Sequence, residues 1–468
     1  MPSNACEFHR DVRNRESVGK VLSLLFQEPV PGQAGHDFGG STELHPVGVI
    51  ALGLLSALAV TLPRRFAGLP IIFLLCFIPA GQRVVLATVD FTFIRLLMMV
   101  VWFRIYIRRE IRPIVWNHLD RAMIAWAVIS VLTGTLLGWT MSVFINRTGT
   151  AVDAMMVYFF FRMLIRNHHE LLSMTTQFLL TSFAVAVFFF IESRTSQNLF
   201  SVFGGVPEIT DVRDGRLRCQ GAFAHAILAG CFWACLIPLY AMRGFLGKGW
   251  SLSIAGGIAA VFIIAMCASS TPVMALGFGM VGAAAFLIRG SLRWLRWLIL
   301  LWLCVLHFAL MKQPVWHLLS RVDVVGGSTG WHRFHLVDKF FAYFHEWWLV
   351  GTHGTGHWGP GLHDITNQYV AEGVYGGILR LAAFSATILF AFAGISRSMR
   401  LPEAGRAYWL CSWALGTALF MHCMNFIAVS YFEQIVVQWH MVLAVIGSVT
   451  LVPGASPTRQ LAAMHTGS

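Results

Sequence analysis

The sequence carries few charged residues for its length. Acidic and basic residues make up 12% of the 468 residues, whereas hydrophobic residues make up 57%. An ordinary soluble domain has about 25% charged residues, so this composition excludes that class. Apolar runs recur between residues 46 and 452, and most approach the length of about 20 residues that spans a bilayer. We therefore predict an all-α, polytopic membrane helix bundle.

Acidic residues are the scarcer sign of charge. The chain has 22 Asp and Glu against 34 Lys and Arg, which gives a formal net charge of +12. The basic residues are not pooled in one patch, so the charge does not indicate a nucleic-acid partner. They lie in short turns between apolar runs, and the positive-inside rule places such turns in the cytoplasm. These turns contain Arg64 and Arg65, residues 104–121, Arg162 and Arg166, Arg243 and Lys248, residues 289–296 and residues 397–406.

Frameworks of cysteine or metal ligands are also missing. The nine cysteines lie mostly within apolar runs and indicate no disulfide or zinc framework. The sequence has no HExxH motif, and its outer loops have no Asp-x-Asp pair. His353, His357 and His363 form the one histidine trio that would suit zinc. The glycines and prolines around them preclude a helix, so their spacing does not set a ligand geometry. We predict no metal site and no cofactor.

The apolar runs define the domain organisation. We predict a polar N-terminal tail over residues 1–44, a membrane domain over residues 45–453 and a C-terminal tail over residues 454–468. Counting the apolar runs that approach a span of about 20 residues gives about 12 or 13 transmembrane helices in the membrane domain. The predicted spans are 46–62, 66–80, 91–107, 122–140, 150–165, 171–191, 222–242, 251–268, 272–288, 294–311, 367–394, 407–425 and 431–452.

Two larger polar loops, 192–221 and 312–366, do not follow the positive charge bias and are expected on the outer, periplasmic face. The longest polar interruption, residues 321–377, includes most of the second loop. Polar residues beside a bilayer are costly unless they meet a polar partner, so we look for function here. Residues 331–349 have apolar side chains at helical spacing, which predicts an amphipathic helix within this periplasmic loop.

Arg333 falls in the apolar stripe of this predicted helix. One interpretation is an arginine that reaches the lipid headgroups. We favour an anion ligand, because GGSTG at residues 326–330 would leave backbone N–H groups free at the helix start. A guanidinium beside such a helix start suits a phosphate or a diphosphate.

Four segments, in order, resemble the bacterial O-antigen ligase and O-antigen polymerase superfamily. They are residues 62–97, GRLRCQGAFAHAILAG at 215–230, STGWHRFHLVDKFFAYFHEWWLVGTHGTG at 328–356 and HDITNQYVAEGVYGG at 363–377. The chain departs from the family pattern in two places. SSTP at residues 269–272 stands where the family often has Ser-Arg, and the His-Asn pair of the family is separated here as His363 and Asn367.

The resemblance implies a metal-independent glycosyltransferase of the bacterial inner membrane that acts at the periplasmic face. The donor would be an undecaprenyl diphosphate-linked glycan, and the acceptor another glycan, lipid A core or a protein. Such an enzyme would serve as a polymerase or ligase in O-antigen or exopolysaccharide biosynthesis, among membrane lipids and polysaccharide export or chain-length partners. By motif, Arg218 and Arg333 would contact the diphosphate, and His363 would act on the acceptor hydroxyl.

The chemistry of these residues agrees with that expectation. The guanidinium group of arginine can neutralise a departing diphosphate with two parallel hydrogen bonds. Histidine is the natural base near neutral pH. His332 and His225 are the rival bases. Arg216 and Arg218 have a simpler alternative, which is to pair with Asp211 and Asp214 in their own loop. The predicted substrate-binding residues are Arg216, Arg321, His332, Asn367 and Tyr369.

The alternative function is a multi-spanning transporter of a small anion or polar solute. It is suggested by polar residues within the apolar runs, namely Arg95, Asp153, Glu372, His422 and Glu433. The two halves of the sequence show no convincing inverted repeat and no paired broken helices, which favours the enzyme. A membrane scaffold without catalysis is the third hypothesis.

Overall fold

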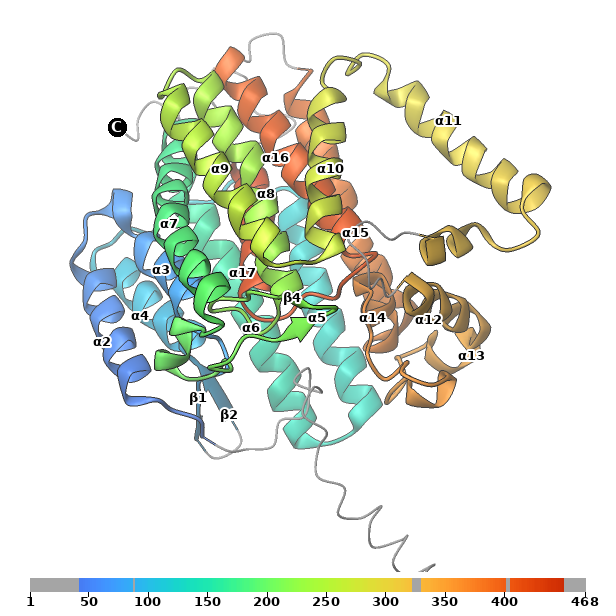
Figure 1. Cartoon of the computed structure of the whole chain (residues 1–468), viewed down its shortest axis with the longest axis horizontal. Coiled ribbons are helices and arrows are strands. Elements are labelled where there is room, and N and C mark those ends of the chain that lie inside the picture. The colour runs from blue at the N-terminus through green and yellow to red at the C-terminus, as the bar shows by residue number, and fades with distance from the viewer. Residues whose placement is uncertain (1–41, 87–88, 322–329, 401–404, 450–468) are drawn as a thin grey trace, which may run out of the picture. The chain divides into compact units, whose positions relative to one another are not determined.

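The computed structural model describes residues 42–86, 89–321, 330–400 and 405–449, which are predominantly helical (Figure 1). Most of the two predicted tails, and residues 326–329 of the glycine-rich segment, lie outside these ranges. Among the described helices, four are long and apolar enough to cross a membrane, namely α5 (His118–Gly138), α7 (His168–Thr195), α8 (Ala226–Phe245) and α15 (Gly377–Ser398). The helical class predicted from composition is confirmed.

Every predicted apolar range contains a helix. The remaining α-helices are α2 (Pro46–Thr61), α3 (Leu69–Phe77), α4 (Phe93–Ile107), α6 (Met141–Leu164), α9 (Trp250–Met266), α10 (Ser270–Ala284), α11 (Leu292–Val305), α12 (Gly330–Ala342), α13 (Phe344–Trp347), α14 (Gln368–Val374), α16 (Arg406–Asn425) and α17 (Gln434–Val449). Short 3₁₀ helices cover Arg64–Phe66, Leu199–Phe203, Val315–Arg321 and Gly356–Trp358, and a π-helical turn covers Leu306–Leu310.

Two small antiparallel hairpins were not predicted. One pairs β1 (Arg83–Leu86) with β2 (Val89–Thr92), and the other pairs β3 (Val212–Arg213) with β4 (Arg216–Leu217). Both lie in the lower part of the view in Figure 1, where β4 passes in front of α5 and α6. They shape the polar loops and leave the helical class unchanged.

The core is centred on α8. This helix packs against α7, α9, α10, α16 and α17. In its most apolar stretch of 18 residues, 78% of the residues are buried. In α15 the corresponding fraction is 28%, so that helix presents most of its apolar surface outward. An enclosed helix surrounded by helices that are apolar on their outer faces is the arrangement expected of a bundle in lipid.

The basic turns predicted to share one face are tied together by hydrogen bonds. Arg64 donates from Nη2 to the Met163 carbonyl at 2.8 Å. Arg166 donates from Nη2 to the Pro113 carbonyl at 2.9 Å. Both contacts use carbonyls at helix ends or in connections, which otherwise lack partners. The arginines of these turns therefore stabilise the connections of the bundle.

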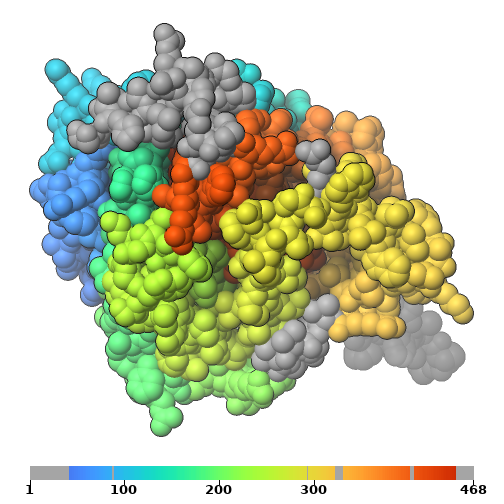
Figure 2. All heavy atoms as spheres, turned by 90° about the horizontal axis from the view of Figure 1, so that it is seen from above, coloured from blue at the N-terminus to red at the C-terminus, as the bar shows by residue number. Residues whose placement is uncertain are grey.

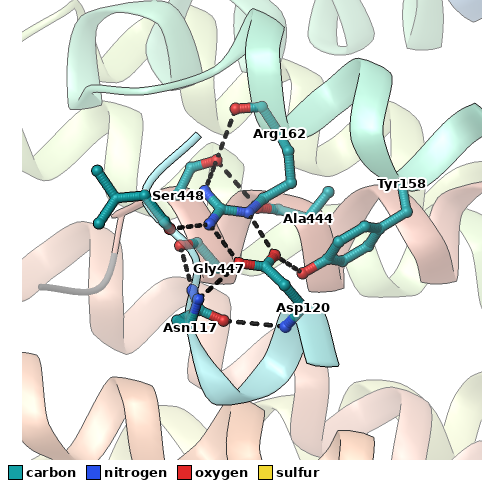
Figure 3. Close-up of polar contacts among 8 residues, drawn as sticks. Asn117, Asp120, Tyr158, Arg162, Ala444, Gly447 and Ser448 are labelled. Atoms are coloured by element: carbon teal, nitrogen blue, oxygen red, sulfur yellow. Dashed lines mark hydrogen bonds and ion pairs between the residues drawn. The ribbon is translucent and has the colours of Figure 1, made fainter. Parts of the chain in front are cut away.

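A buried ion pair fastens α5, α6 and α17 (Figure 3). Asp120 is fully buried, and its Oδ1 accepts from Arg162 Nε at 2.8 Å and from the Tyr158 hydroxyl at 2.6 Å. Its Oδ2 accepts from the Asn117 backbone N–H at 2.9 Å, while Asn117 Oδ1 caps the backbone N–H of Asp120 at 3.0 Å. Arg162 also donates from Nη1 to Ser448 Oγ at 3.1 Å. The carboxylate is fully satisfied, as a buried charge requires.

The amphipathic helix predicted over residues 331–349 is divided in two. α12 ends at Ala342, and after Tyr343 the chain starts the short α13. The division lets Trp347 fold back, so that its ring stacks on Phe340 with centroids 3.9 Å apart and its Nε1 donates to the Phe340 carbonyl at 2.8 Å. Stacking of two large aromatic side chains replaces the helical turn that the periodicity predicted.

The span predicted over residues 367–394 is also interrupted. α14 ends at Val374, and α15 begins at Gly377, whose φ of 70° is a left-handed conformation that glycine adopts without strain. The interruption exposes the Val374 carbonyl, which accepts from the Thr352 backbone N–H at 2.8 Å. The loop after α13 is thereby joined to the junction between α14 and α15.

Helix α11 has a broad exposed apolar surface, seen in yellow in Figure 2. The helical stretch Trp294–Leu310, which comprises most of α11 and the π-helical turn, meets the 3₁₀ helix Val315–Arg321 at an angle of 92°, so the two form a broken span or a re-entrant segment. An apolar surface of this extent is typical of a segment covered by lipid or by another protein. The exposed side chains include Trp294, Trp297, Leu298, Leu301 and Trp302.

Candidate functional site: a cationic region beside a histidine loop

The loop 192–221 is anchored by the buried side chain of Glu192 at the end of α7. Glu192 Oε1 accepts from Thr210 Oγ1 at 2.9 Å and from the Gln220 backbone N–H at 3.0 Å. Its Oε2 accepts from the Gly221 backbone N–H at 3.1 Å. One carboxylate therefore holds the distal part of the loop at two places, and Arg218 lies between them in the sequence.

The hairpin of β3 and β4 directs Arg218 toward the helices. Its turn is formed by Asp214 and Gly215, with φ values of 52° and 73°, the left-handed pair that a two-residue hairpin requires. The Arg218 backbone N–H then donates to the Asp211 carbonyl at 2.9 Å. The side chain that follows is 7% exposed, so this loop arginine lies inside the protein.

Arg218 has little compensation for its buried charge. The nearest carboxylate oxygen, Asp211 Oδ2, is 3.9 Å from Nη1, and the Asp211 side chain is 68% exposed. Arg218 Nε is buried without a hydrogen-bond partner among the described residues. Burial lowers the pKa of Arg218 below its ordinary value, and the charge of Arg213 lowers it further. An anion at this guanidinium would relieve both effects.

Arg333 is the second buried arginine of the region. It projects from the first turn of α12, is 6% exposed and donates from Nε to the Ala428 carbonyl at 3.1 Å. Its Nη2 donates to Thr271 Oγ1 at 3.1 Å, in the first turn of α10. Burial lowers the pKa of Arg333, and the charge of Arg213 lowers it further. Its burial agrees with a position in the apolar stripe, whereas the neighbouring GGST lies outside the described residues.

Arg218 and Arg333 border a common cationic region, although no hydrogen bond joins them. The charge of Arg213 acts on both, and the Arg333 contact with Thr271 places this region at the start of α10. The start of a 15-residue helix adds a partial positive charge and backbone N–H groups. A region that contains several positive groups favours an anion with more than one negative oxygen, such as a diphosphate.

The loop between α13 and α14, which contains His353, His357 and His363, is called the histidine loop. It contacts the helical turn that carries Arg333. His332 Nε2 is 3.0 Å from the Asp364 carbonyl oxygen, and because a carbonyl only accepts, Nε2 carries the proton. Nδ1 of His332 is then the basic nitrogen. His363, adjacent to Asp364, is exposed, and the described residues give it no hydrogen bond. The structure therefore brings His332 and the His363 loop together next to a buried arginine.

His225, the other rival base, serves the start of α8. Its Nδ1 accepts from the Ile227 backbone N–H at 3.1 Å, which is a helix-capping contact. Burial, followed by the charge of Arg218, lowers the pKa of His225 to about 4. The ring is neutral near pH 7 and its acceptor nitrogen is occupied, so it is a poor candidate for a general base.

Two predicted substrate ligands are occupied within the protein. Asn367 is the cap of α14, where its Oδ1 accepts from the Val370 backbone N–H at 3.1 Å and its Nδ2 donates to the Ile427 carbonyl at 3.1 Å. The Tyr369 hydroxyl donates to the Cys423 carbonyl at 3.1 Å. These contacts hold α14 against the end of α16, which gives both residues a positioning role.

The two supporting arginines are exposed. Arg216 begins β4, and Arg321 ends the 3₁₀ helix Val315–Arg321. Neither is among the groups whose charge contributes to the shifted pKa of Arg218 or Arg333. Arg213, which pairs with Arg216 across the same hairpin, is the arginine whose charge reaches both Arg218 and Arg333.

The histidine trio does not converge. Within the described ranges, no three His, Cys, Asp or Glu side chains are grouped so that they could hold a metal ion. His357 instead lies with its Nε2 at 2.7 Å from Glu346 Oε2, which also accepts from Trp358 Nε1 at 2.9 Å. This contact joins α13 to the loop that carries His363.

Sequence reasoning missed Glu192 and Thr271. Glu192 sits at the first position of the predicted outer loop, where an acid at the end of an apolar run was a usable signal. Thr271 lies in SSTP, the segment singled out because an arginine was expected there. In this chain, Arg333 from another segment reaches the same turn.

The fold and the site define a helical protein with several helices able to cross a membrane and a buried cationic region beside a histidine loop. Neither a scan against protein-family models nor a search of curated proteins finds a match to this chain.

Proposed function

We propose that this chain is a membrane glycosyltransferase of the O-antigen ligase and polymerase type, which transfers or polymerises an undecaprenyl diphosphate-linked glycan. The observation that carries the proposal is the pair of buried arginines, Arg218 and Arg333. Among the described residues, Arg218 has only the exposed Asp211 carboxylate at 3.9 Å and Arg333 has no carboxylate partner, and the charge of Arg213 acts on both arginines. Uncompensated buried cations are costly, so their arrangement around one region supports an anionic ligand.

The proposed topology is the one expected from the charge pattern. The chain would cross the bacterial inner membrane about 12 or 13 times, at about 20 residues per span, with the loops 192–221 and 312–366 in the periplasm. The interaction of the basic turns with one another supports a common face for them. Residues Arg218, Arg333 and His363 would then act at the opposite face.

In the proposed reaction, the acceptor hydroxyl oxygen attacks the anomeric carbon of the donor sugar. A new glycosidic bond forms, the bond between that carbon and the diphosphate oxygen breaks, and undecaprenyl diphosphate leaves. His363 takes the hydroxyl proton, with His332 as its alternative. Arg218 and Arg333 stabilise the negative charge that grows on the leaving diphosphate, and their fixed positions avoid reorganisation during the step.

The arginine assignment is tested by Arg333→Ala and Arg218→Ala. Each variant should weaken donor binding and slow product formation by roughly 10- to 150-fold, the cost of losing a charge-assisted hydrogen bond of about 1.5–3 kcal/mol. Lysine at either position should restore part of the loss, because a point charge lacks the bidentate fork. The measurements are donor-lipid binding and product formation by the purified full-length protein.

A matched control is Arg296→Ala. Arg296 is exposed on α11, where its guanidinium lies 5.6 Å from the Trp297 ring centroid, so its replacement removes a positive charge without touching the site. It should bind donor and turn over normally. Full activity of a folded Arg333→Ala protein would leave Arg333 as a structural link between α12 and α10.

The topology is tested by cysteine labelling with a membrane-impermeant reagent in intact cells. The background is Cys304→Ser, since Cys304 is the exposed native cysteine among the described residues. Asp214→Cys should label and Arg109→Cys should not. The two sites form a matched pair, because both are exposed and have left-handed φ values of 52° and 53°. The reverse labelling pattern would invert the orientation and contradict a periplasmic site.

The transporter alternative has one observation in its favour, the broken pair around residues 311–314. The polar residues that suggested it are largely satisfied by internal partners. Arg95 donates to both Asp153 oxygens, at 2.7 and 2.6 Å, and His422 Nδ1 lies 2.9 Å from the Tyr431 hydroxyl. Groups occupied in this way do not line a permeation path, so the observations favour the enzyme.

A further inference from the structure

Arg147 is a further arginine without an acidic partner among the described residues, and it lies outside the region just described. It projects from α6 about 9 Å along the axis from Met141, is half-buried and has no hydrogen bond or ion pair among the described residues. Its guanidinium carbon lies 5.6 Å from the centroid of the Tyr375 ring. Several other arginines of the bundle do have an acidic partner, among them Arg95 with Asp153, Arg104 with Glu110 and Arg162 with Asp120.

The acid whose charge acts on Arg147 is shared with other partners. Glu372 is buried, and its Oε1 accepts from Gln368 Nε2 at 2.8 Å. Its Oε2 accepts from Trp126 Nε1 at 3.0 Å and from Arg380 Nε at 2.8 Å. The charge of Arg380 also acts on Arg147. Arg147, Arg380 and Glu372 together carry two positive charges and one negative charge, so their net charge is positive.

The backbone of α5 makes room for the Arg147 side chain. A Cβ at Gly134 would lie 2.9 Å from Arg147 Nε and 3.0 Å from its Cδ, so the side chain passes directly over this glycine. The guanidinium is therefore held between α5 and the Tyr375 ring while remaining partly accessible. Because the Arg147 side chain is already held in place and its guanidinium is partly accessible, binding a ligand would cost little additional side-chain entropy.

The position of Arg147 relates it to the histidine loop. Tyr375, which stacks against Arg147, lies within electrostatic reach of Asp364. The Asp364 carbonyl in turn accepts from His332, the neighbour of Arg333. The histidine loop is thus linked on one side to the arginine assigned to the donor and on the other to Arg147.

We propose that Arg147, supported by Arg380 and Tyr375, binds a phosphate group carried by a lipid-linked acceptor. This inference rests on the proposed function, because a transferase must hold two substrates on either side of its base. Arg147 lies near the outer end of α6 in the proposed topology, at the level where the phosphate of a membrane lipid would lie. A phosphate would supply the negative oxygens that the described residues do not.

The test is equilibrium binding of radiolabelled farnesyl diphosphate to the purified full-length protein in detergent. The wild-type protein should show two sites per chain. Arg147→Gln should keep one site and weaken the other by roughly 10- to 150-fold, as expected for a lost charge-assisted bond. Arg147→Lys should recover part of this affinity. Because Arg147 makes no hydrogen bond to the described residues, Arg147→Gln should fold and melt like the wild type.

Arg65→Gln is the matched control. Arg65 also stacks on a ring, that of Phe66, at 4.8 Å, but it lies in a basic turn at the opposite face in the proposed topology. It should retain both sites. Arg380→Lys, which keeps a positive partner for Glu372, should weaken the same site as Arg147→Gln.

The outcomes separate this inference from the proposed function. Two intact sites in Arg147→Gln would overturn it while leaving the donor site in place. Loss of one site in Arg333→Ala and of the other in Arg147→Gln would support both proposals, whereas no binding to the wild type would overturn both. Competition by phosphatidylglycerol as strong as that by farnesyl diphosphate would show a general headgroup site and overturn the assignment to a substrate.

Discussion

Replacing His363 with alanine is expected to slow product formation by roughly 10²- to 10⁴-fold, the contribution typical of a general base. Donor binding should stay near the wild-type value, because the diphosphate is assigned to Arg218 and Arg333. His363 is exposed and makes no hydrogen bond among the described residues, so its removal should not unfold the loop. The measurements are single-turnover product formation and donor-lipid binding by the same preparation.

His332→Ala and His353→Ala complete the comparison. His332 has a basic Nδ1, because its Nε2 donates to the Asp364 carbonyl, and it is the base if His363→Ala remains active. His353 is an exposed histidine of the same loop with no assigned role, so its alanine variant should turn over normally. Equal losses in all three variants would indicate damage to the loop and contradict a specific base.

Asp120→Asn is expected to destabilise the protein by about 3–5 kcal/mol, the usual cost of breaking a buried ion pair from one side. The variant leaves Arg162 buried without its carboxylate, and the links from α6 to α5 and α17 weaken together (Figure 3). Thermal unfolding of the full-length protein in detergent measures the effect. The double variant Asp120→Asn, Arg162→Leu should recover part of the loss, since it removes the unpaired charge as well.

Asp214→Asn is the control for this loss of stability. Asp214 forms an exposed pair with Arg213 at 3.8 Å, and such pairs contribute about 0–1 kcal/mol. Asparagine also tolerates the left-handed backbone at this position, where φ is 52°. A melting temperature as high in Asp120→Asn as in Asp214→Asn would show that the buried pair does not stabilise the bundle.

The helices could be predicted because their signal is local. Each apolar range of the sequence contains a helix, since side chains that avoid water mark a helix without reference to any other segment. The interruptions after Ala342 and before Gly377 were not predicted. The first depends on Trp347 stacking on Phe340, and the second on a contact between Thr352 and Val374. Both are interactions between segments, which periodicity does not report.

The candidate site was predictable only in part for the same reason. The position of Arg333 in the apolar stripe agrees with its burial in the structure, because helical geometry alone determines which face a residue occupies. Its partner Thr271 is 62 positions away in the sequence and could not be inferred from spacing. Asn367 and His225 cap helices through local contacts. From the sequence alone, their polar side chains instead suggest Asn367 as a substrate ligand and His225 as a base.

The attachment of the outer loop to Glu192 has a consequence for how such proteins diverge. Thr210, Gln220 and Gly221 are all held by one carboxylate at the end of α7, so both ends of the segment that carries Arg218 are fixed by a single side chain. Residues 201–209 are not among these contacts and none of them is buried, so we expect their sequence to vary more freely than the acid and the arginine. Proteins with the same chemistry can then share an acid at a helix end and an arginine just before the next helix, with little else in common between them.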